Sequence, residues 1–187
     1  PGAIRLSDSA KLMRGLNGLG VYMDNKADFL CLPGSNLHAE AGSVSFWFRP
    51  MWAPDDKRNK VFFWAAFEKG EILLFGNSAN LMVADGTGKQ HYGVTGASAD
   101  TSQWKAGQWH HAALVWSAKQ QFCRLFMDGA GQASSPYTSP AQGPARIISL
   151  SPSPTDLSGR TPACAVLDEF AMYDHPLSEE DISKLYR

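Results

Sequence analysis

The stretch Val44-Ser-Phe-Trp-Phe-Arg-Pro50 decides the fold class of this chain. Apolar Val44, Phe46 and Phe48 alternate with the other side chains, and a period of two is the pattern of a half-buried β-strand. We therefore expect these three residues to face a hydrophobic core. Trp47 then lies on the outer face of the sheet, and an outward tryptophan is a candidate for binding.

Short apolar stretches of this kind recur along the chain, separated by turn-forming pairs such as Asn17-Gly18, Asp85-Gly86 and Asp128-Gly129. This rhythm is typical of an all-β sandwich or barrel. A long amphipathic helix is not expected. The expected strands are Gly20–Met23, Phe29–Leu32, Val44–Arg49, Val61–Phe67, Glu71–Phe75, Asn80–Ala84, Trp109–Trp116, Phe122–Met127, Ala145–Leu150 and Ala165–Tyr173.

The chain of 187 residues fits one domain, since a single sandwich core often takes up a chain of this length. Residues 1–17 precede the first expected strand as an N-terminal lead-in. Near the other end, Ser178 is suited to cap a short helix over residues 178–187, and the acidic residues after it favour the positive end of that helix. Ile182, Leu185 and Tyr186 then form an apolar stripe that can dock on the sandwich.

Charge and hydropathy exclude several partners. The 17 basic and 18 acidic residues give a formal net charge of −1. No run of Lys or Arg offers the concentrated positive face that nucleic acid or an anionic membrane requires. The apolar stretches are too short to cross a bilayer. Because the chain begins at Pro1 without an initiator Met, we expect it to be part of a larger protein.

Four motifs occur in sequence order: Gly20–Asp24, Val44–Pro50, Gly107–Trp116 continuing into Arg124–Gly129, and Val166–Asp174 followed by Leu177–Ile182. They resemble the motifs of the LamG-like jelly-roll family, in the laminin-G-like and concanavalin A-like lectin/glucanase superfamily. The resemblance implies a two-sheet antiparallel jelly-roll β-sandwich whose first and last strands are adjacent. It also implies a module that binds glycans, proteins or other surfaces.

A structural Ca²⁺ near the adjoining first and last strands is a further implication of the resemblance. The matching positions are Asp24 and Asp168, and Asn25 stands where the family usually has glycine. Calcium prefers several oxygen ligands, which these residues and nearby carbonyls can supply. The alternative is that the two carboxylates bond to turn amides or to a nearby cation.

Exposed aromatic residues are the candidates for sugar binding. Sugars stack their apolar CH faces on aromatic rings, while planar polar groups bind their hydroxyls. The alternative is that an outward ring packs beneath a loop that covers the sheet. The candidate ligand-binding residues are Trp47, Arg49, Trp64, His91, Tyr92 and Phe126.

The histidines and cysteines give weaker indications of a functional site than the aromatic residues do. His110 and His111 are neighbours on a strand, so their side chains point to opposite faces and cannot hold one metal together. His38, His91 and His175 are isolated in the sequence, and a lone His is more often a surface or hydrogen-bonded residue than a ligand.

The cysteines are widely spaced, and we interpret them as small buried thiols. The one disulfide worth testing is Cys31 with Cys164.

Catalysis is not expected. Glycoside hydrolysis requires two carboxyl groups on either side of the cleaved bond, and the closely spaced acids of laminarinase-type relatives are missing from the sequence. Glu68 and Glu71 come nearest, but they lie on either side of Gly70 in an expected turn. No other catalytic motif is present.

The sequence therefore predicts a noncatalytic, extracytoplasmic recognition module that binds a polysaccharide or a glycoprotein through a sheet face or rim loops. A protein–protein adhesion module of a larger surface or secreted protein is the alternative. A glycoside hydrolase is a third and weaker hypothesis.

Overall fold

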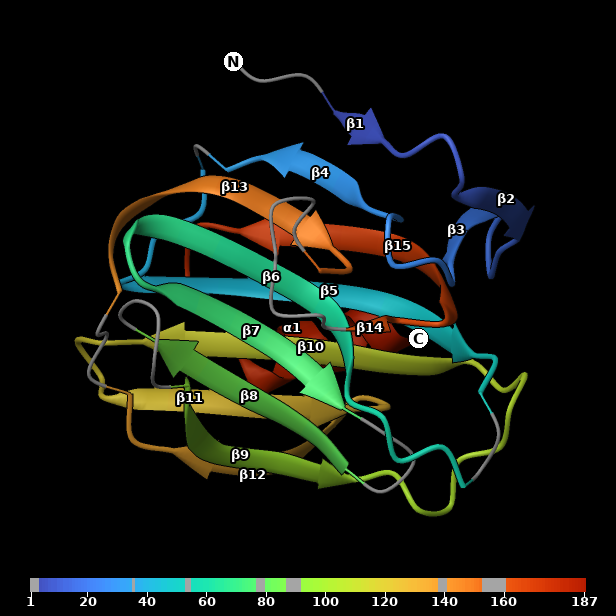
Figure 1. Ribbon diagram of the computed structural model, residues 1–187. Helices are drawn as coiled ribbons and strands as arrows, with labels where there is room; N and C mark the ends of the chain where they lie inside the picture. Colours follow the sequence, from blue (N-terminus) through green and yellow to red (C-terminus); the bar gives the residue numbers. More distant parts are fainter. Residues whose placement is uncertain are drawn as a thin grey trace.

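Two β-sheets lie face to face and enclose one hydrophobic core (Figure 1). The computed structural model describes residues 4–34, 36–52, 55–76, 80–86, 92–137, 141–152 and 161–187, with the backbone alone for 80–86 and 92–98. Most of the described chain is strand, and one short helix follows the last strand. The predicted antiparallel jelly-roll sandwich is confirmed.

The first sheet, called the β6 sheet here, lies at the front in Figure 1. Its described strands are paired in the order β1 (Arg5–Leu6), β4 (Leu30–Pro33), β13 (Gln142–Leu150), β6 (Lys60–Lys69), β7 (Glu71–Gly76), β8 (Asn80–Gly86) and β9 (Tyr92–Asp100). The short strand β14 (Thr161–Pro162) runs parallel to the start of β6.

The second sheet, called the β5 sheet, lies behind the first. Its described strands are paired in the order β12 (Ala130–Ser135), β11 (Phe122–Met127), β10 (His110–Ser117), β5 (Ala41–Pro50), β15 (Ala165–Tyr173), β3 (Leu19–Met23) and β2 (Lys11–Arg14). In β3 and β15, Val21 is opposite Leu167 and Met23 is opposite Ala165. The predicted adjacency of the first and last expected strands is therefore confirmed.

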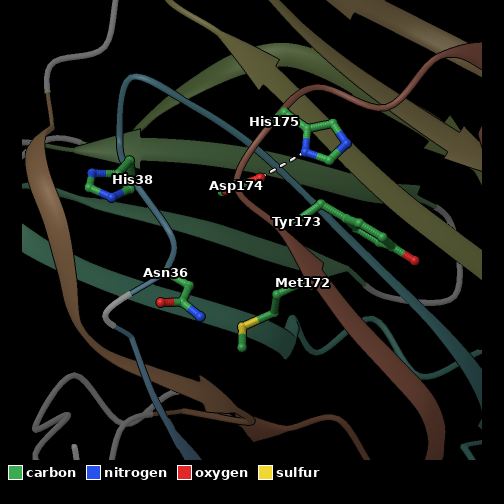
Figure 2. Close-up of a pocket in the computed structure, with 6 residues that line it drawn as sticks. All are labelled: Asn36, His38, Met172, Tyr173, Asp174 and His175. Atoms are coloured by element: carbon green, nitrogen blue, oxygen red, sulfur yellow. Dashed lines mark hydrogen bonds and ion pairs between the residues drawn. The ribbon is translucent and has the colours of Figure 1, made fainter.

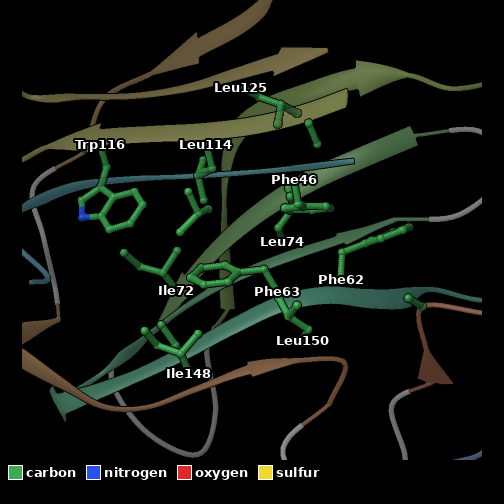
Figure 3. Packing of buried hydrophobic residues seen from close by; sticks show 14 of the residues in the cluster. Phe46, Phe62, Phe63, Ile72, Leu74, Leu114, Trp116, Leu125, Ile148 and Leu150 are labelled. Carbon is green, nitrogen blue, oxygen red and sulfur yellow. The ribbon is translucent and has the colours of Figure 1, made fainter. Parts of the chain in front are cut away.

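The core fills the space between the sheets with aromatic and branched side chains (Figure 3). Val44, Phe46 and Phe48 are all fully buried, as their alternation predicts. The Phe46 and Phe62 rings stack across the core with centroids 6.5 Å apart. These contacts fix which face of β5 points inward, and Trp47 accordingly lies on the outer face of the sheet.

All ten predicted strands are present, and the described residues add five that the sequence did not predict: β1, β2, β9, β12 and β14. Two of these, β1 and β2, lie within the lead-in of residues 1–17, so this segment contributes an outer strand to each sheet.

The predicted helix is present as α1 (Glu179–Tyr186). Ser178 caps it: the Ser178 hydroxyl accepts a hydrogen bond from the Asp181 amide, while the Asp181 carboxylate accepts one from the Ser178 amide. Ile182 is fully buried against the sandwich. This helix is too short to span a membrane, and among the described residues none is long and apolar enough to do so.

Candidate functional site

A surface cavity of about 490 Å³ opens beside the end of β15. We call it the rim cavity. Figure 2 shows the six residues that line it: Asn36, His38, Met172, Tyr173, Asp174 and His175. They come from two places, the segment before β5 and the end of the last strand. The volume is within the usual range of ligand-binding clefts.

The segment before β5 presents its polar side chains because it alternates. Leu37 and Ala39 are fully buried, whereas Asn36 and His38 are exposed. The His38 carbonyl accepts a hydrogen bond from the indole Nε1 of buried Trp116 at 3.1 Å. A core tryptophan therefore fixes the backbone that carries the His38 side chain.

The turn after β15 is held by a buried serine of β5. The Ser43 hydroxyl donates to the His175 carbonyl and accepts from the Leu177 amide, both at 2.9 Å. The neighbouring Gly42 is needed here, because a Cβ would come within 2.7 Å of the Trp116 ring and 3.1 Å of the Tyr173 carbonyl oxygen. Ser43 and Gly42, at the start of β5, therefore hold in place the turn that lines the rim cavity.

One hydrogen bond joins two polar side chains of the rim cavity. His175 Nδ1 and Asp174 Oδ1 are 2.7 Å apart, and both side chains are exposed. This hydrogen bond keeps the pKa of the Asp174 carboxyl below its usual value. With Nδ1 donating to Asp174, a neutral His175 offers Nε2 as an acceptor. The half-buried Tyr173 ring lies beside this pair, at 6.1 Å from the His175 ring.

The outer face of the β5 sheet is covered by α1. Trp47 lies there as predicted, but the Tyr186 ring stacks on it with centroids 5.4 Å apart and an angle of 14° between the planes. Phe126 is buried at 2% exposure and packs with Ala113, Val115 and Ile182. The prediction of an exposed Phe126 is therefore wrong, because the apolar stripe of the helix docks on it.

Arg49 also lies on this outer face, but it is used within the protein. Its guanidinium is 5.1 Å from the centre of the Trp109 ring, and Nη2 donates to the Arg14 carbonyl at 3.2 Å. Arg49 therefore ties β5 to the end of β2.

Trp64 lies on the outer face of the opposite sheet. It packs with Val61, Leu73 and Phe75, and its indole Nε1 donates to Glu71 Oε2. Tyr92 begins β9 in the same sheet, with only its backbone described, and His91 lies outside the described residues. Among the predicted ligand-binding residues whose side chains are described, Trp47, Arg49 and Phe126 lie on one outer face and Trp64 lies on the opposite one, so these four do not form one cluster.

The residues that line the rim cavity are not among the predicted ligand-binding residues. His38 and His175 are isolated in the sequence, and Tyr173 and Asp174 belong to the last of the motifs that resemble the LamG-like family. A signal was present in the run Tyr173-Asp174-His175, where a strand ends in an aromatic, an acid and an imidazole. The approach of residues 36–38 to this run depends on the sheet order, which spacing along the chain does not give.

A comparison with models of known protein families identifies the superfamily of this chain. The sequence model described as "Concanavalin A-like lectin/glucanases superfamily" matches residues 24–183. The chain belongs to this superfamily. Among curated proteins, none matches this sequence significantly.

Solved structures resemble this superfamily member over its whole length. The botulinum neurotoxin serotype D binding domain has a TM-score of 0.76 at 15% identity, covering 98% of this chain and 46% of that one. The serotype D ligand-binding domain in complex with N-acetylneuraminic acid gives 0.74 at 15%, covering 98% and 45%. This chain thus spans less than half of the toxin chains. Domain 4 of AbnA, a GH43 extracellular arabinanase from Geobacillus stearothermophilus, in complex with arabinotriose, gives 0.69 at 20%, covering 100% and 82%.

The predicted calcium ligands of this superfamily member are not brought together. Asp24 directly follows Met23 and Asp168 directly follows Leu167, at opposite ends of the β3–β15 pairing. They are therefore about four residue steps, or roughly 13 Å, apart along the strands. Asp168 Oδ2 accepts from the Leu16 and Asn17 amides at 2.8 and 3.1 Å, which is the predicted alternative of bonding to turn amides.

At the other end of the pairing, Asp24 is 3.6 Å from Lys11 Nζ, and the Asn25 side chain accepts from the Ala27 amide. The local acceptor is Asp28, which the sequence did not single out. Its Oδ2 accepts from the Asp24 and Asn25 amides, each at 2.9 Å. The three predicted ligands do not fit one calcium site, and calcium binding by this chain stays a prediction.

The remaining sequence predictions concern cysteines and acids. Cys31, Cys123 and Cys164 are free, with the first two buried and the third half-buried. Glu68 and Glu71 lie on either side of Gly70 in the β6–β7 turn, as predicted. Glu71 is already bonded to Trp64.

Proposed function

We propose that this chain is a noncatalytic, extracytoplasmic module that binds carbohydrate, and that the rim cavity is its binding site. The observation that carries the proposal is that the half-buried Tyr173 and four residues with planar polar side chains line one open cavity. Aromatic rings take the CH faces of sugars, and planar amide, carboxylate and imidazole groups bind their hydroxyls.

The similar structures support this proposal. By their names, the two toxin structures are binding domains, and two of the three similar structures are complexes, one with N-acetylneuraminic acid and one with arabinotriose. A carbohydrate-binding role in a larger extracytoplasmic protein agrees with both of these complexes. A catalytic role has less support, because Glu68 and Glu71 adjoin a hairpin turn, neither of them lines the rim cavity, and Glu71 is bonded to Trp64.

The test is binding to a glycan array, followed by calorimetry with the best ligand. Tyr173→Ala is expected to weaken binding at least tenfold, a loss of about 1.4 kcal/mol. His38→Ala, at an exposed position where folding is not at risk, is expected to weaken it less. Trp64→Ala on the opposite sheet is the control and is expected to bind normally. Loss in Trp64→Ala alone would move the site to the β6 sheet, and a wild-type chain that binds no glycan would refute the proposed function.

One observation favours the alternative of protein adhesion. Leu12 and Leu19 lie on the same face of the β2–β3 hairpin as the core residue Val21, yet they are 61% and 65% exposed. The hairpin thus extends past the core and leaves apolar surface uncovered. A surface protein whose binding is lost in Leu12→Asp and kept in Tyr173→Ala would favour adhesion.

A further inference from the structure

A second cavity adjoins the rim cavity. It has a volume of about 390 Å³ and shares Tyr173 and His175 with the first. Its other lining residues, Leu177, Asp181, Lys184 and Leu185, come from α1 and the turn before it. We call it the helix cavity. The two cavities have Tyr173 and His175 in common at the end of β15, and we call the pair of cavities the groove.

The two cavities differ in chemistry. The rim cavity is lined mainly by planar polar side chains. The helix cavity has an apolar wall of Leu177 and Leu185, and Leu185 is 37% exposed. Apolar walls suit the CH faces of a sugar ring, whereas planar polar groups suit its hydroxyls. Each cavity alone lies within the size range of ligand sites, so the groove has room for more than one sugar residue.

The charges along the groove disfavour acidic ligands. With the imidazoles of His38 and His175 counted as neutral, its lining carries two carboxylates, Asp174 and Asp181, and one ammonium group, Lys184. Lys184 Nζ is 2.8 Å from Glu180 Oε1, so its charge is already paired. The Asp181 carboxylate accepts from Ser178, which keeps its pKa below the usual value. A carboxylate or sulfate on the ligand would therefore meet like charge without a free cation.

We infer that the groove binds an uncharged glycan chain of at least two sugar residues, one in each cavity, rather than a single terminal or acidic sugar. This inference rests on the proposed function. The turn after β15 carries His175, which lines both cavities, and Leu177, which lines the helix cavity, and the Ser43 hydroxyl bonds to the backbone of both residues. The spacing between the two cavities is therefore fixed by the core.

The test uses the full chain and neutral oligosaccharides of one to four residues, with calorimetry as the readout. The affinity of the wild-type chain is expected to rise about tenfold or more from one residue to the longer chains. Leu185→Asn, which changes the apolar wall of the helix cavity, is expected to abolish this gain. Leu16→Asn, which changes another exposed leucine outside the groove, is the matched control and is expected to retain the gain. Circular dichroism checks that α1 stays folded.

A second series compares each neutral chain with a uronate-containing chain of the same length, which is expected to bind more weakly. Equal affinity for one residue and for the longer chains, or a preference for the acidic chain, would overturn this inference while the proposed function stands. Unchanged binding in Tyr173→Ala would instead refute the rim cavity as the site, and with it the groove.

Discussion

At the residue scale, one aspartate links two motifs that lie apart in the sequence. Asp128 Oδ2 is 3.0 Å from His110 Nδ1, and its Oδ1 accepts from the His111 amide at 2.8 Å. The pair His110-His111 and the Asp128-Gly129 turn therefore occur together because one carboxylate bonds to both histidines. The predicted opposite orientation of the two imidazoles is confirmed: His110 stacks on Trp104 at 4.4 Å, and His111 lies 5.3 Å from Trp47.

The buried His111 ring predicts a loss of stability in mild acid. Burial lowers its pKa from 6.5 to about 4, and the charge of Asp128 opposes this only in part. The unfolded chain takes up the proton near pH 6.5, whereas the folded chain does so only near pH 4. Stability is thus complete above pH 6.5 and falls as the pH drops toward 4, by up to roughly 3 kcal/mol.

Denaturant unfolding between pH 4 and 7 measures this slope. His111→Asn removes the titrating ring and is expected to flatten the curve in this range. A variant whose curve keeps the wild-type slope would show that other groups cause the loss. Carboxyl groups with a lowered pKa, such as that of Asp128, affect the stability at lower pH, because their contribution to the free energy of unfolding is lost only below about pH 4.

At the element scale, α1 was predictable as a helix, but its docking place was not. Ser178 and the acidic residues after it predict the N-terminal cap of the helix, and the apolar stripe predicts that one face of the helix is buried. Which sheet it covers depends on the path of the chain after β15. The strands that were not predicted have a different cause. For example, β12 has the sequence Ala-Gly-Gln-Ala-Ser-Ser, without a large apolar residue, and among the described strands it pairs with β11 alone. A polar edge strand carries no alternation to detect.

The stacking of Tyr186 on Trp47 predicts how firmly α1 is held. Tyr186→Ala is expected to lower the free energy of unfolding by about 1–2 kcal/mol, because ring stacking and burial are both lost. Amide hydrogen exchange in residues 179–186 is expected to become faster. Tyr186→Phe retains the stacked ring and serves as the control. Unchanged exchange in Tyr186→Ala would mean that Ile182 alone anchors the helix.

At the scale of the whole molecule, sequence alternation established the faces of individual strands but not their assembly. Trp47 and Trp64 are both outward residues, yet they belong to different sheets and lie on opposite sides of the sandwich. A period of two tells inside from outside and does not identify the sheet. For the same reason, the fold class could be predicted from the sequence. The rim cavity could not, because its location depends on how β5 and β15 are placed relative to each other.

The crossover from the β5 sheet to the β6 sheet contains a buried charge. Lys60 is fully buried, its Nζ is 3.0 Å from Asp56 Oδ2, and it lies 4.7 Å from the centre of the Trp52 ring. Hydrogen bonds from Arg58 keep the pKa of Asp56 far below its usual value. Removing one partner of a buried pair leaves the other charge uncompensated, which costs about 3–5 kcal/mol.

Asp56→Ala is therefore expected to be strongly destabilising in thermal or denaturant unfolding. The double variant Asp56→Ala/Lys60→Met removes both charges and is expected to recover most of the loss, because an apolar side chain of similar size fills the site. A double variant as unstable as Asp56→Ala would show that the ion pair itself, rather than the unpaired lysine, determines stability at this crossover.

The contribution of α1 to the helix cavity has a consequence for engineering the module. Trimming the polypeptide after its last strand would preserve both sheets, yet it would strip away Asp181, Lys184 and Leu185 and uncover Trp47. A unit that keeps both cavities therefore includes α1 as far as Tyr186, and a tag or fusion partner placed directly after this helix would be attached next to the helix cavity.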